Sequence, residues 1–224
     1  SGTNTNTGVT SINGGAISVE ADANLGAATS VAINAATLTI GGTGTFSSAK
    51  NFTMNGVATI NNTNTTNAST FSGNFTNGAN LLTVTGSGNT TISGVIGSGS
   101  GGLTKDGTGT LTLSNTNTYT GATTINNGAT LKLGSATTIS NSSALVVNGT
   151  LDLAGYSETV GSIAGASTGL ITSTASGTPV LTAGGDNSST TYAGVIQNGS
   201  ASTVALTKVG TGTLTLSGTN TNTG

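Results

Sequence analysis

Apolar and polar residues alternate in short runs along most of the chain. The runs place aliphatic side chains at every second position, as in Val31–Ile33, Leu38–Ile40, Leu111–Leu113 and Leu214–Leu216. Successive side chains of an extended strand point to opposite faces, so this alternation predicts short strands with one buried face. Glycine, threonine, serine and asparagine fill most other positions and disfavour helix interiors. We therefore expect an all-β chain with no helices of note.

Asn-Gly dipeptides separate many of these runs and mark turns, because both residues accept a positive φ at low cost. They occur at Asn13-Gly14, Asn55-Gly56, Asn77-Gly78, Asn127-Gly128, Asn148-Gly149 and Asn198-Gly199. A sandwich, a barrel and a parallel β-helix all combine short strands with frequent turns. We favour a parallel β-helix of about nine or ten short rungs, because the strands are very short and their inward residues are small aliphatics.

The chain contains repeats at two levels. Residues 1–8 and 217–224 both read SGTNTNTG, an offset of 216. Residues 103–114 match 206–217 at eleven of twelve positions, and 121–133 resemble 8–20. These two internal offsets, 103 and 113, together make up the longer one. We expect residues 1–224 to be one solenoid segment, with one period of 216 residues from a tandem array and two diverged sub-units, roughly 1–102 and 103–216.

Charge and reactive side chains are nearly absent, which removes several classes of function. Only 4% of the 224 residues are charged, the net charge is −2, and the chain has no histidine, cysteine or tryptophan. Four lysines neutralise too few phosphates for nucleic-acid binding. Without histidine and cysteine there is no classical zinc site, no Ser-His-Asp or Cys-His machinery and no disulfide framework. No apolar run is long enough for a membrane helix, and we expect no cofactor and no membrane contact by this segment.

The strongest motif lies in 94–134, GVIGSGSGGLTKDGTGTLTLSNTNTYTGATTINNGATLKLG. It resembles the passenger-associated transport repeat of bacterial autotransporter passengers. The positions that fit are Gly102, Leu103, Lys105, Gly107, Gly109, Leu111, Leu113, Asn117, Tyr119, Gly121, Thr123, Ile125, Gly128 and Leu131. The second copy keeps Leu206, Lys208, Gly210, Gly212, Leu214 and Leu216, and Asn222 replaces its tyrosine. The resemblance implies a right-handed β-helix that is secreted and exposed on the bacterial cell surface.

Polar residues offer few candidate sites. Glu20, Asp22 and Asn24 alternate along one strand face, but Ca²⁺ needs six to eight oxygens, so we interpret them as a solvated edge rather than a metal site. The other carboxylates are scattered, and there is no arginine, which argues against a polysaccharide-active enzyme. They are Asp106, Asp152, Glu158 and Asp186.

Two further residue types have a functional and a structural interpretation. Lys105 and Lys208 occupy equivalent positions, and we expect solvated charges that oppose sideways sheet aggregation rather than a pairing role. Tyrosines at 119, 156 and 192 are expected to cover rung edges rather than stack against sugars. Threonines at every second position in 108–112 and 116–120 resemble an ice-binding array, but they recur only about once per sub-unit.

The sequence thus predicts a structural repeat of a long secreted surface protein. It would form a β-solenoid stalk or extracellular fibre with a role in adhesion, biofilm or cell-surface architecture. Its expected partners are neighbouring repeats of the same chain, with like fibres or surface glycans as further contacts through many weak sites. The alternative is an adhesin module with one specific glycan- or receptor-binding site.

Overall fold

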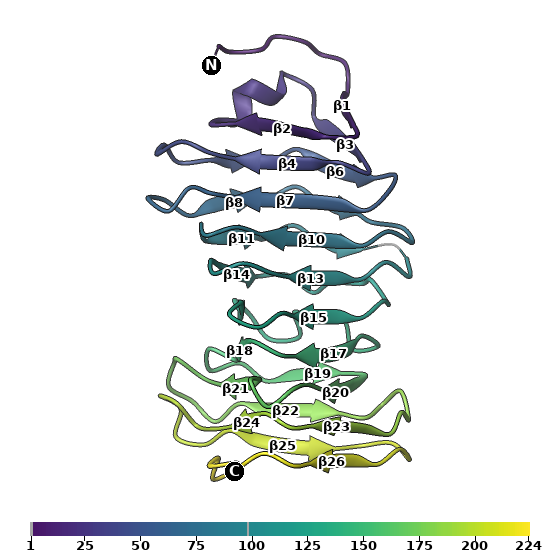
Figure 1. Ribbon diagram of the computed structural model, residues 1–224, viewed down its shortest axis with the longest axis vertical. Helices are drawn as coiled ribbons and strands as arrows, with labels where there is room; N and C mark the ends of the chain where they lie inside the picture. The colour runs from purple at the N-terminus through teal and green to yellow at the C-terminus, as the bar shows by residue number, and fades with distance from the viewer. Residues whose placement is uncertain (1, 98) are drawn as a thin grey trace.

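The computed structural model describes residues 2–97 and 99–224 and shows a parallel β-solenoid (Figure 1). Every strand pair is parallel, and each strand pairs with the one a full turn later, between 18 and 25 residues along the chain. One short 3-10 helix, η1 (Asp22–Leu25), is the only helix in the described residues. These observations confirm the expected all-β β-helix of about ten turns. The N-terminus lies at one end of the stack and the C-terminus at the other.

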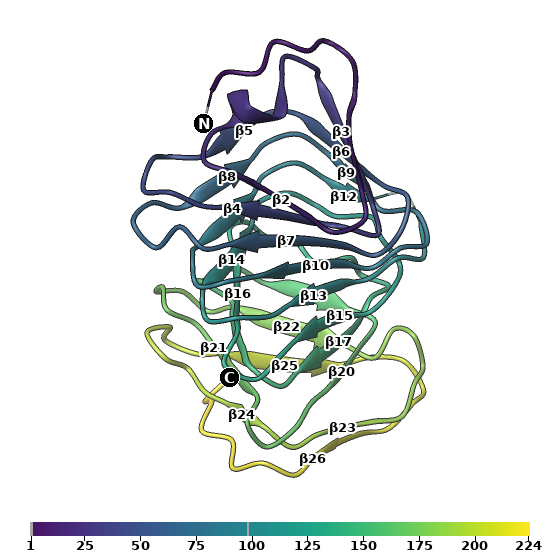
Figure 2. The ribbon, with the colours of Figure 1, turned by 45° about the horizontal axis from the view of Figure 1, so that its top comes forward.

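Each turn crosses three faces, which Figure 2 separates in the first half of the chain. The first face begins with β1 (Thr10–Asn13), β3 (Ser30–Asn34), β6 (Asn51–Met54), β9 (Phe75–Thr76) and β12 (Ile96–Gly97). The second contains β2 (Ala16–Val19), β4 (Thr37–Ile40), β7 (Ala58–Asn62), β10 (Leu82–Thr85), β13 (Leu103–Lys105), β15 (Thr123–Ile125), β17 (Ala144–Val147) and β20 (Ser162–Ala164). The third contains β5 (Ser47–Ser48), β8 (Ser69–Phe71), β11 (Thr90–Ile92), β14 (Thr110–Leu113), β16 (Thr130–Leu133), β18 (Thr150–Asp152), β21 (Leu170–Thr172) and β24 (Val195–Ile196).

The first face loses regular strands for two turns after β12. Isolated backbone bonds bridge the interruption: Thr118 N–H donates to Ile96 O (2.9 Å), and Asn117 N–H donates to Thr138 O (3.3 Å). The face then resumes as β19 (Glu158–Val160), β22 (Val180–Ala183) and β25 (Ala205–Lys208). The line of contacts from Ile96 to Glu158 is therefore continuous, although the strands are not.

The second face also changes its pairing near the C-terminal end. A parallel bridge between Gly165 and Tyr192 joins the end of β20 to β23 (Thr190–Tyr192), which pairs with β26 (Leu214–Leu216). The second face thus has ten strands, from β2 to β26. Ten turns consequently span the 216-residue offset.

The two identical octapeptides both lie in third-face positions. Residues 217–224 follow β26, and Thr221 N–H donates to Ile196 O in β24 (2.9 Å). Residues 2–8 precede β1, and Asn4 N–H donates to Ala23 O (3.0 Å) in the next turn. One copy contacts the turn before it, and the other contacts the turn after it.

Inward-pointing side chains form one continuous apolar column. Four phenylalanines, Phe46, Phe52, Phe71 and Phe75, pack together in the N-terminal half, with the Phe52 and Phe75 rings stacked at a centroid distance of 4.9 Å. Aliphatic residues, together with Met54, Tyr119 and Tyr192, fill the column elsewhere. The backbone hydrogen bonds between strands and the apolar column both repeat from turn to turn. Each turn therefore depends on the turns next to it for the burial of its apolar side chains.

Candidate functional site

The repeat motif of 103–133 is built into the core and the turns. Leu103, Leu111 and Leu113 are completely buried between consecutive levels. In the second copy, Leu206 and Leu214 are only partly buried, and Leu216 is 42% exposed. The difference arises because β25 and β26 have no strand beyond them in the described part of the chain.

Motif glycines allow the backbones of successive turns to approach closely. A Cβ at Gly109 would lie 2.1 Å from Gly88 O, and one at Gly212 would lie 2.2 Å from Ser188 O. Gly107 and its counterpart Gly210 have φ of +68° and +70°, which only glycine adopts without strain. The same steric or conformational demand applies to Gly102, Gly121 and Gly128.

The expectation that Lys105 is a solvated charge is wrong, because its side chain is buried. Its side chain is 1% exposed, and its Nζ donates to the backbone oxygens of Asp106 and Gly107. Burial lowers the pKa of Lys105 to about 8, with Asp106 opposing that shift. Lys208 makes the same two contacts, with Val209 O and Gly210 O, but is exposed. The lysine therefore stabilises the following turn by binding its carbonyls.

Asn117 replaces the backbone of a strand where the first face is interrupted. Its Oδ1 accepts the N–H of Ile96 at 2.7 Å, and its Nδ2 donates to Thr138 O at 2.6 Å. In the second copy of the motif, Asn220 Oδ1 accepts the N–H of Ile196 at 2.8 Å. The 103-residue offset thus identifies a structural role that the motif alone did not reveal.

Glu158 performs a similar role two turns further on. Its Oε2 accepts hydrogen bonds from Thr138 N–H (2.7 Å), Thr138 Oγ1 (3.0 Å) and Ile139 N–H (3.0 Å). Burial raises the pKa of Glu158, and these donors oppose the rise. With every oxygen engaged by the backbone or by Thr138, this carboxylate is a structural group inside the solenoid.

Two of the three tyrosines lie inside the core, which corrects the expectation that they cover rung edges. Tyr119 and Tyr192 are completely buried, whereas Tyr156 is 40% exposed. The Tyr119 hydroxyl lies 2.7 Å from Thr123 Oγ1, which lies 2.9 Å from Ser143 Oγ. Burial raises the pKa of Tyr119 above its ordinary range. Neither buried ring presents a face to a sugar.

The residues Glu20, Asp22 and Asn24 do not converge on one point. Asn24 Oδ1 accepts the N–H groups of Glu20 and Ala21 at 3.0 Å, beside η1. Asp22 forms an ion pair with Lys50 at 3.2 Å. Across residues 2–97 and 99–224, no group of three or more histidine, cysteine, aspartate or glutamate residues is arranged to hold a metal.

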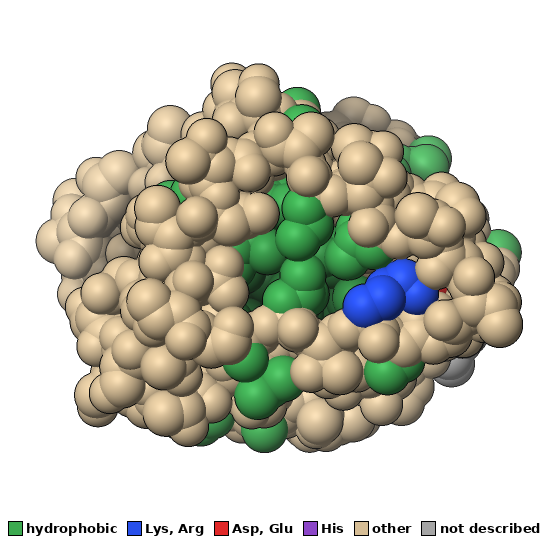
Figure 3. Space-filling view, turned by 90° about the horizontal axis from the view of Figure 1, so that it is seen from below, with side chains coloured by type: hydrophobic (Ala, Val, Ile, Leu, Met, Phe, Trp, Pro, Cys, Tyr) green, Lys and Arg blue, Asp and Glu red, His purple; other side chains and the backbone are tan. Residues whose placement is uncertain are grey.

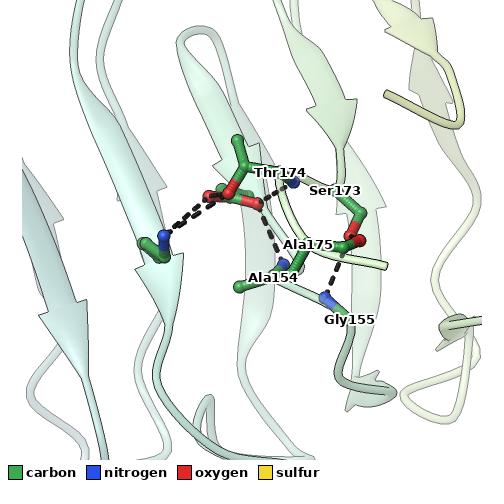
Figure 4. A network of polar contacts seen from close by, with 7 residues as sticks. Ala154, Gly155, Ser173, Thr174 and Ala175 are labelled. Atoms are coloured by element: carbon green, nitrogen blue, oxygen red, sulfur yellow. Dashed lines mark hydrogen bonds and ion pairs between the residues drawn. The ribbon is translucent and has the colours of Figure 1, made fainter. Parts of the chain in front are cut away.

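Asp152, at the end of β18, organises a corner of the third face. Figure 4 shows the polar network there, with Ala154, Gly155, Ser173 and Thr174. Its Oδ1 accepts Ala154 N–H (2.9 Å) and Thr174 N–H (2.8 Å), and its Oδ2 accepts Thr174 Oγ1 (2.6 Å) and lies 3.7 Å from Lys132 Nζ. Beside it, Ser173 Oγ accepts Gly155 N–H. The carboxylate joins two turns, and both of its oxygens accept hydrogen bonds.

On the third face, threonines stack from turn to turn in two columns, Thr70–Thr91–Thr112 and Thr110–Thr130–Thr150. The two columns overlap only at the level of Thr110 and Thr112, because Thr112 pairs with Lys132 in the following turn. An open groove of about 450 Å³ lies at the N-terminal end and is lined by residues that include Thr3, Glu20 and Asn24.

Residues 103–133 and 206–224 match the family model described as the passenger-associated-transport-repeat. This confirms the resemblance in those two segments, and together with the solenoid it fits a repeat of a secreted passenger domain. Comparison with curated proteins and comparison with solved structures gave no match. None of the described helices has the length and apolar character to cross a membrane.

Proposed function

We propose that the chain is one period of a tandem array that forms the shaft of a secreted bacterial surface protein. Its sub-units are roughly 1–102 and 103–216. The observation that carries the proposal is the pair of identical octapeptides on the third face, ten turns apart, one bonded to the turn before and one to the turn after. In an array, a single octapeptide would be both the end of one period and the start of the next, and the two periods would join without a gap.

The mechanism is mechanical. Backbone hydrogen bonds hold each level to the next, and the glycines of the motif permit that close stacking. Few charges recur along the stack, so levels about 4.8 Å apart do not accumulate like-charge repulsion. As a surface stalk or fibre, such a shaft would support adhesion or biofilm and cell-surface architecture. Neutral hydroxyl and amide groups on its outside suit many weak contacts with like fibres or surface glycans.

Electron microscopy of chains with one, two and three periods tests this proposal. Ten turns at about 4.8 Å predict a rod that lengthens by about 48 Å with each added period. Particles that become wider or globular, without that increment, would contradict it.

The alternative, an adhesin module with one specific binding site, predicts a different result. A glycan array probed with the 224-residue chain would then give selective, saturable binding. The shaft proposal expects weak signals that rise only when several periods are joined. Release of products from a surface polysaccharide would instead support an enzyme.

A further inference from the structure

The C-terminal end of the solenoid exposes part of the core. Figure 3 looks at this end and shows apolar side chains in the middle, with a basic side chain at the rim. Leu206 and Leu214 are only partly buried there. Ile17, in β2 at the opposite end, is the third partly buried residue packed against the core. Both ends therefore present apolar surface and an unpaired strand edge.

The interior of the chain already contains a template for covering this end. β13 pairs with β15 in the register Leu103↔Thr123 and Lys105↔Ile125. β14 pairs with β16, with Leu111 opposite Leu131 and Leu113 opposite Leu133. By sequence, β25 and β26 repeat β13 and β14, while β1 and β2 repeat β15 and β16. The counterparts of β13 and β14 thus lie at the C-terminal end of the molecule, and the counterparts of β15 and β16 lie at the N-terminal end.

The faces also agree. β13 and β15 lie on the second face, and their counterparts β25 and β1 both lie on the first. β14 and β16 lie on the third face, and their counterparts β26 and β2 both lie on the second. In each pair, both strands have moved to the preceding face of the solenoid. The N-terminal end therefore fits the C-terminal end without rotation about the axis.

The octapeptide supplies the third face of the same junction. Asn4 N–H and Asn6 O bond to the turn that follows, whereas Thr221 N–H bonds to the turn that precedes. Thr221 corresponds to Thr5, so the two sets use different backbone groups of one extended segment. A single octapeptide can make both sets, as Asn117 and Thr118 do inside the chain.

Resting on the proposed tandem array, we propose that the C-terminal end binds the N-terminal end of a second copy in one fixed register. β25 pairs with β1 of that copy, with Leu206 opposite Thr10, Thr207 opposite Ser11 and Lys208 opposite Ile12. β26 pairs with its β2. Because Ile17 follows Ile12 by five residues whereas Leu131 follows Ile125 by six, the inward-pointing Ile17 and Val19 take the places of Leu131 and Leu133 and lie opposite Leu214 and Leu216. Lys208 is then covered by Ile12 as Lys105 is covered by Ile125.

The test uses a chain in which residues 1–216 are followed by the complete 224-residue sequence. The chain contains no cysteine, so introduced pairs are the only thiols. The junction pair is Thr207→Cys in the first copy with Ser11→Cys in the second. A matched control within one copy is Thr104→Cys with Thr124→Cys, which are paired in the observed structure. An offset pair combines Thr207→Cys with Asn13→Cys.

Paired positions on adjacent strands lie about 4.8 Å apart, within reach of a disulfide, whereas the offset pair lies about 8 Å apart. Under mild oxidation we expect the junction and control pairs to lose their thiols to a similar extent, at least tenfold more than the offset pair, as counted by maleimide labelling and intact mass. Oxidation of the control but not of the junction pair would overturn the register, as would preferential oxidation of the offset pair.

Rod length of the same two-copy chain separates this inference from the array itself. If the rod doubles in length but the two junction cysteines stay as free thiols, the proposed register is wrong and the tandem array stands. Two separately folded bodies in electron micrographs, with no continuous rod, overturn the register and the tandem array together.

Discussion

The Oδ1 atom of Asn117 accepts the backbone N–H of Ile96 at 2.7 Å, which is the bond that a neighbouring strand would otherwise supply. The same amide donates to Thr138 O at 2.6 Å and so holds the turns on both sides. Asn117 is buried, and water therefore does not replace either bond when the side chain is removed.

Asn117→Ala should consequently lower the free energy of unfolding by about 1–3 kcal/mol, because the N–H of Ile96 loses its acceptor and Thr138 O keeps only one of its two Asn117 donors, the backbone N–H at 3.3 Å. Chemical denaturation measures the change. Asn115→Ala, at an exposed position two residues earlier, is the control and should cost less than about 1 kcal/mol. Equal effects of the two substitutions would contradict the assigned role.

Close stacking at Gly109 predicts a strong steric effect. Gly109→Ala places a Cβ 2.1 Å from Gly88 O, and backbone cannot move away as a flexible side chain would. We expect a loss of at least about 2 kcal/mol. Gly44→Ala, where a Cβ meets nothing within 4 Å, should change stability by less than about 1 kcal/mol. Thermal unfolding of both variants checks the difference; similar melting temperatures would argue against tight stacking.

Burial of Lys105 predicts a rise in stability at alkaline pH. Its folded-state pKa of about 8 lies below the ordinary 10.5, so between these values the unfolded chain holds the proton more firmly. The free energy of unfolding should therefore increase, by about 1 kcal/mol, from pH 8 to pH 10. Above pH 10 the trend reverses, because the buried Tyr119 stays protonated while tyrosines of the unfolded chain ionise.

Denaturation curves at several pH values measure this slope. Lys105→Met removes the titrating group and should flatten the curve between pH 8 and pH 10. Lys132→Met, at a side chain with 40% exposure, is the matched control and should keep the slope. A slope that survives in Lys105→Met would assign the effect to another group.

Glu158 predicts a pH effect in the acid range. Burial raises its folded-state pKa, so its contribution to stability is complete below the ordinary value of 4.5 and is lost as the pH rises through the raised value. Glu158→Gln should therefore show a smaller decrease in stability from pH 4.5 upward than the natural chain. Circular dichroism during denaturation at pH 4, 5.5 and 7 checks the comparison. Parallel curves for the two proteins would contradict the raised pKa.

The sequence predicted the architecture because period-two alternation and long-range repeats both act over the whole chain. It did not predict which strands share a face. Leu103–Lys105 and Leu206–Lys208 are nearly identical in sequence, yet they lie on different faces. Turn length varies between 18 and 25 residues, and the position of a strand depends on the sum of these lengths rather than on its own residues.

The motif positions were predicted, but their roles were not. A lysine is ordinarily solvated, and the burial of Lys105 depends on two backbone oxygens that a turn directs inward. Glu158 was regarded as one of several scattered carboxylates, since its donors at Thr138 and Ile139 lie about one turn away. Such contacts become visible only when the levels are stacked.

The interruption of the first face has a mechanical consequence. Force applied along the axis is shared by three columns of hydrogen bonds, which resist in parallel. Between β12 and β19 one column contains isolated bonds and the side chains of Asn117 and Glu158 in place of strand ladders. Tension therefore concentrates on the other two columns at this level. In the proposed array this zone would recur once in each period, and we expect a stretched shaft to yield there first, in steps that repeat with the period.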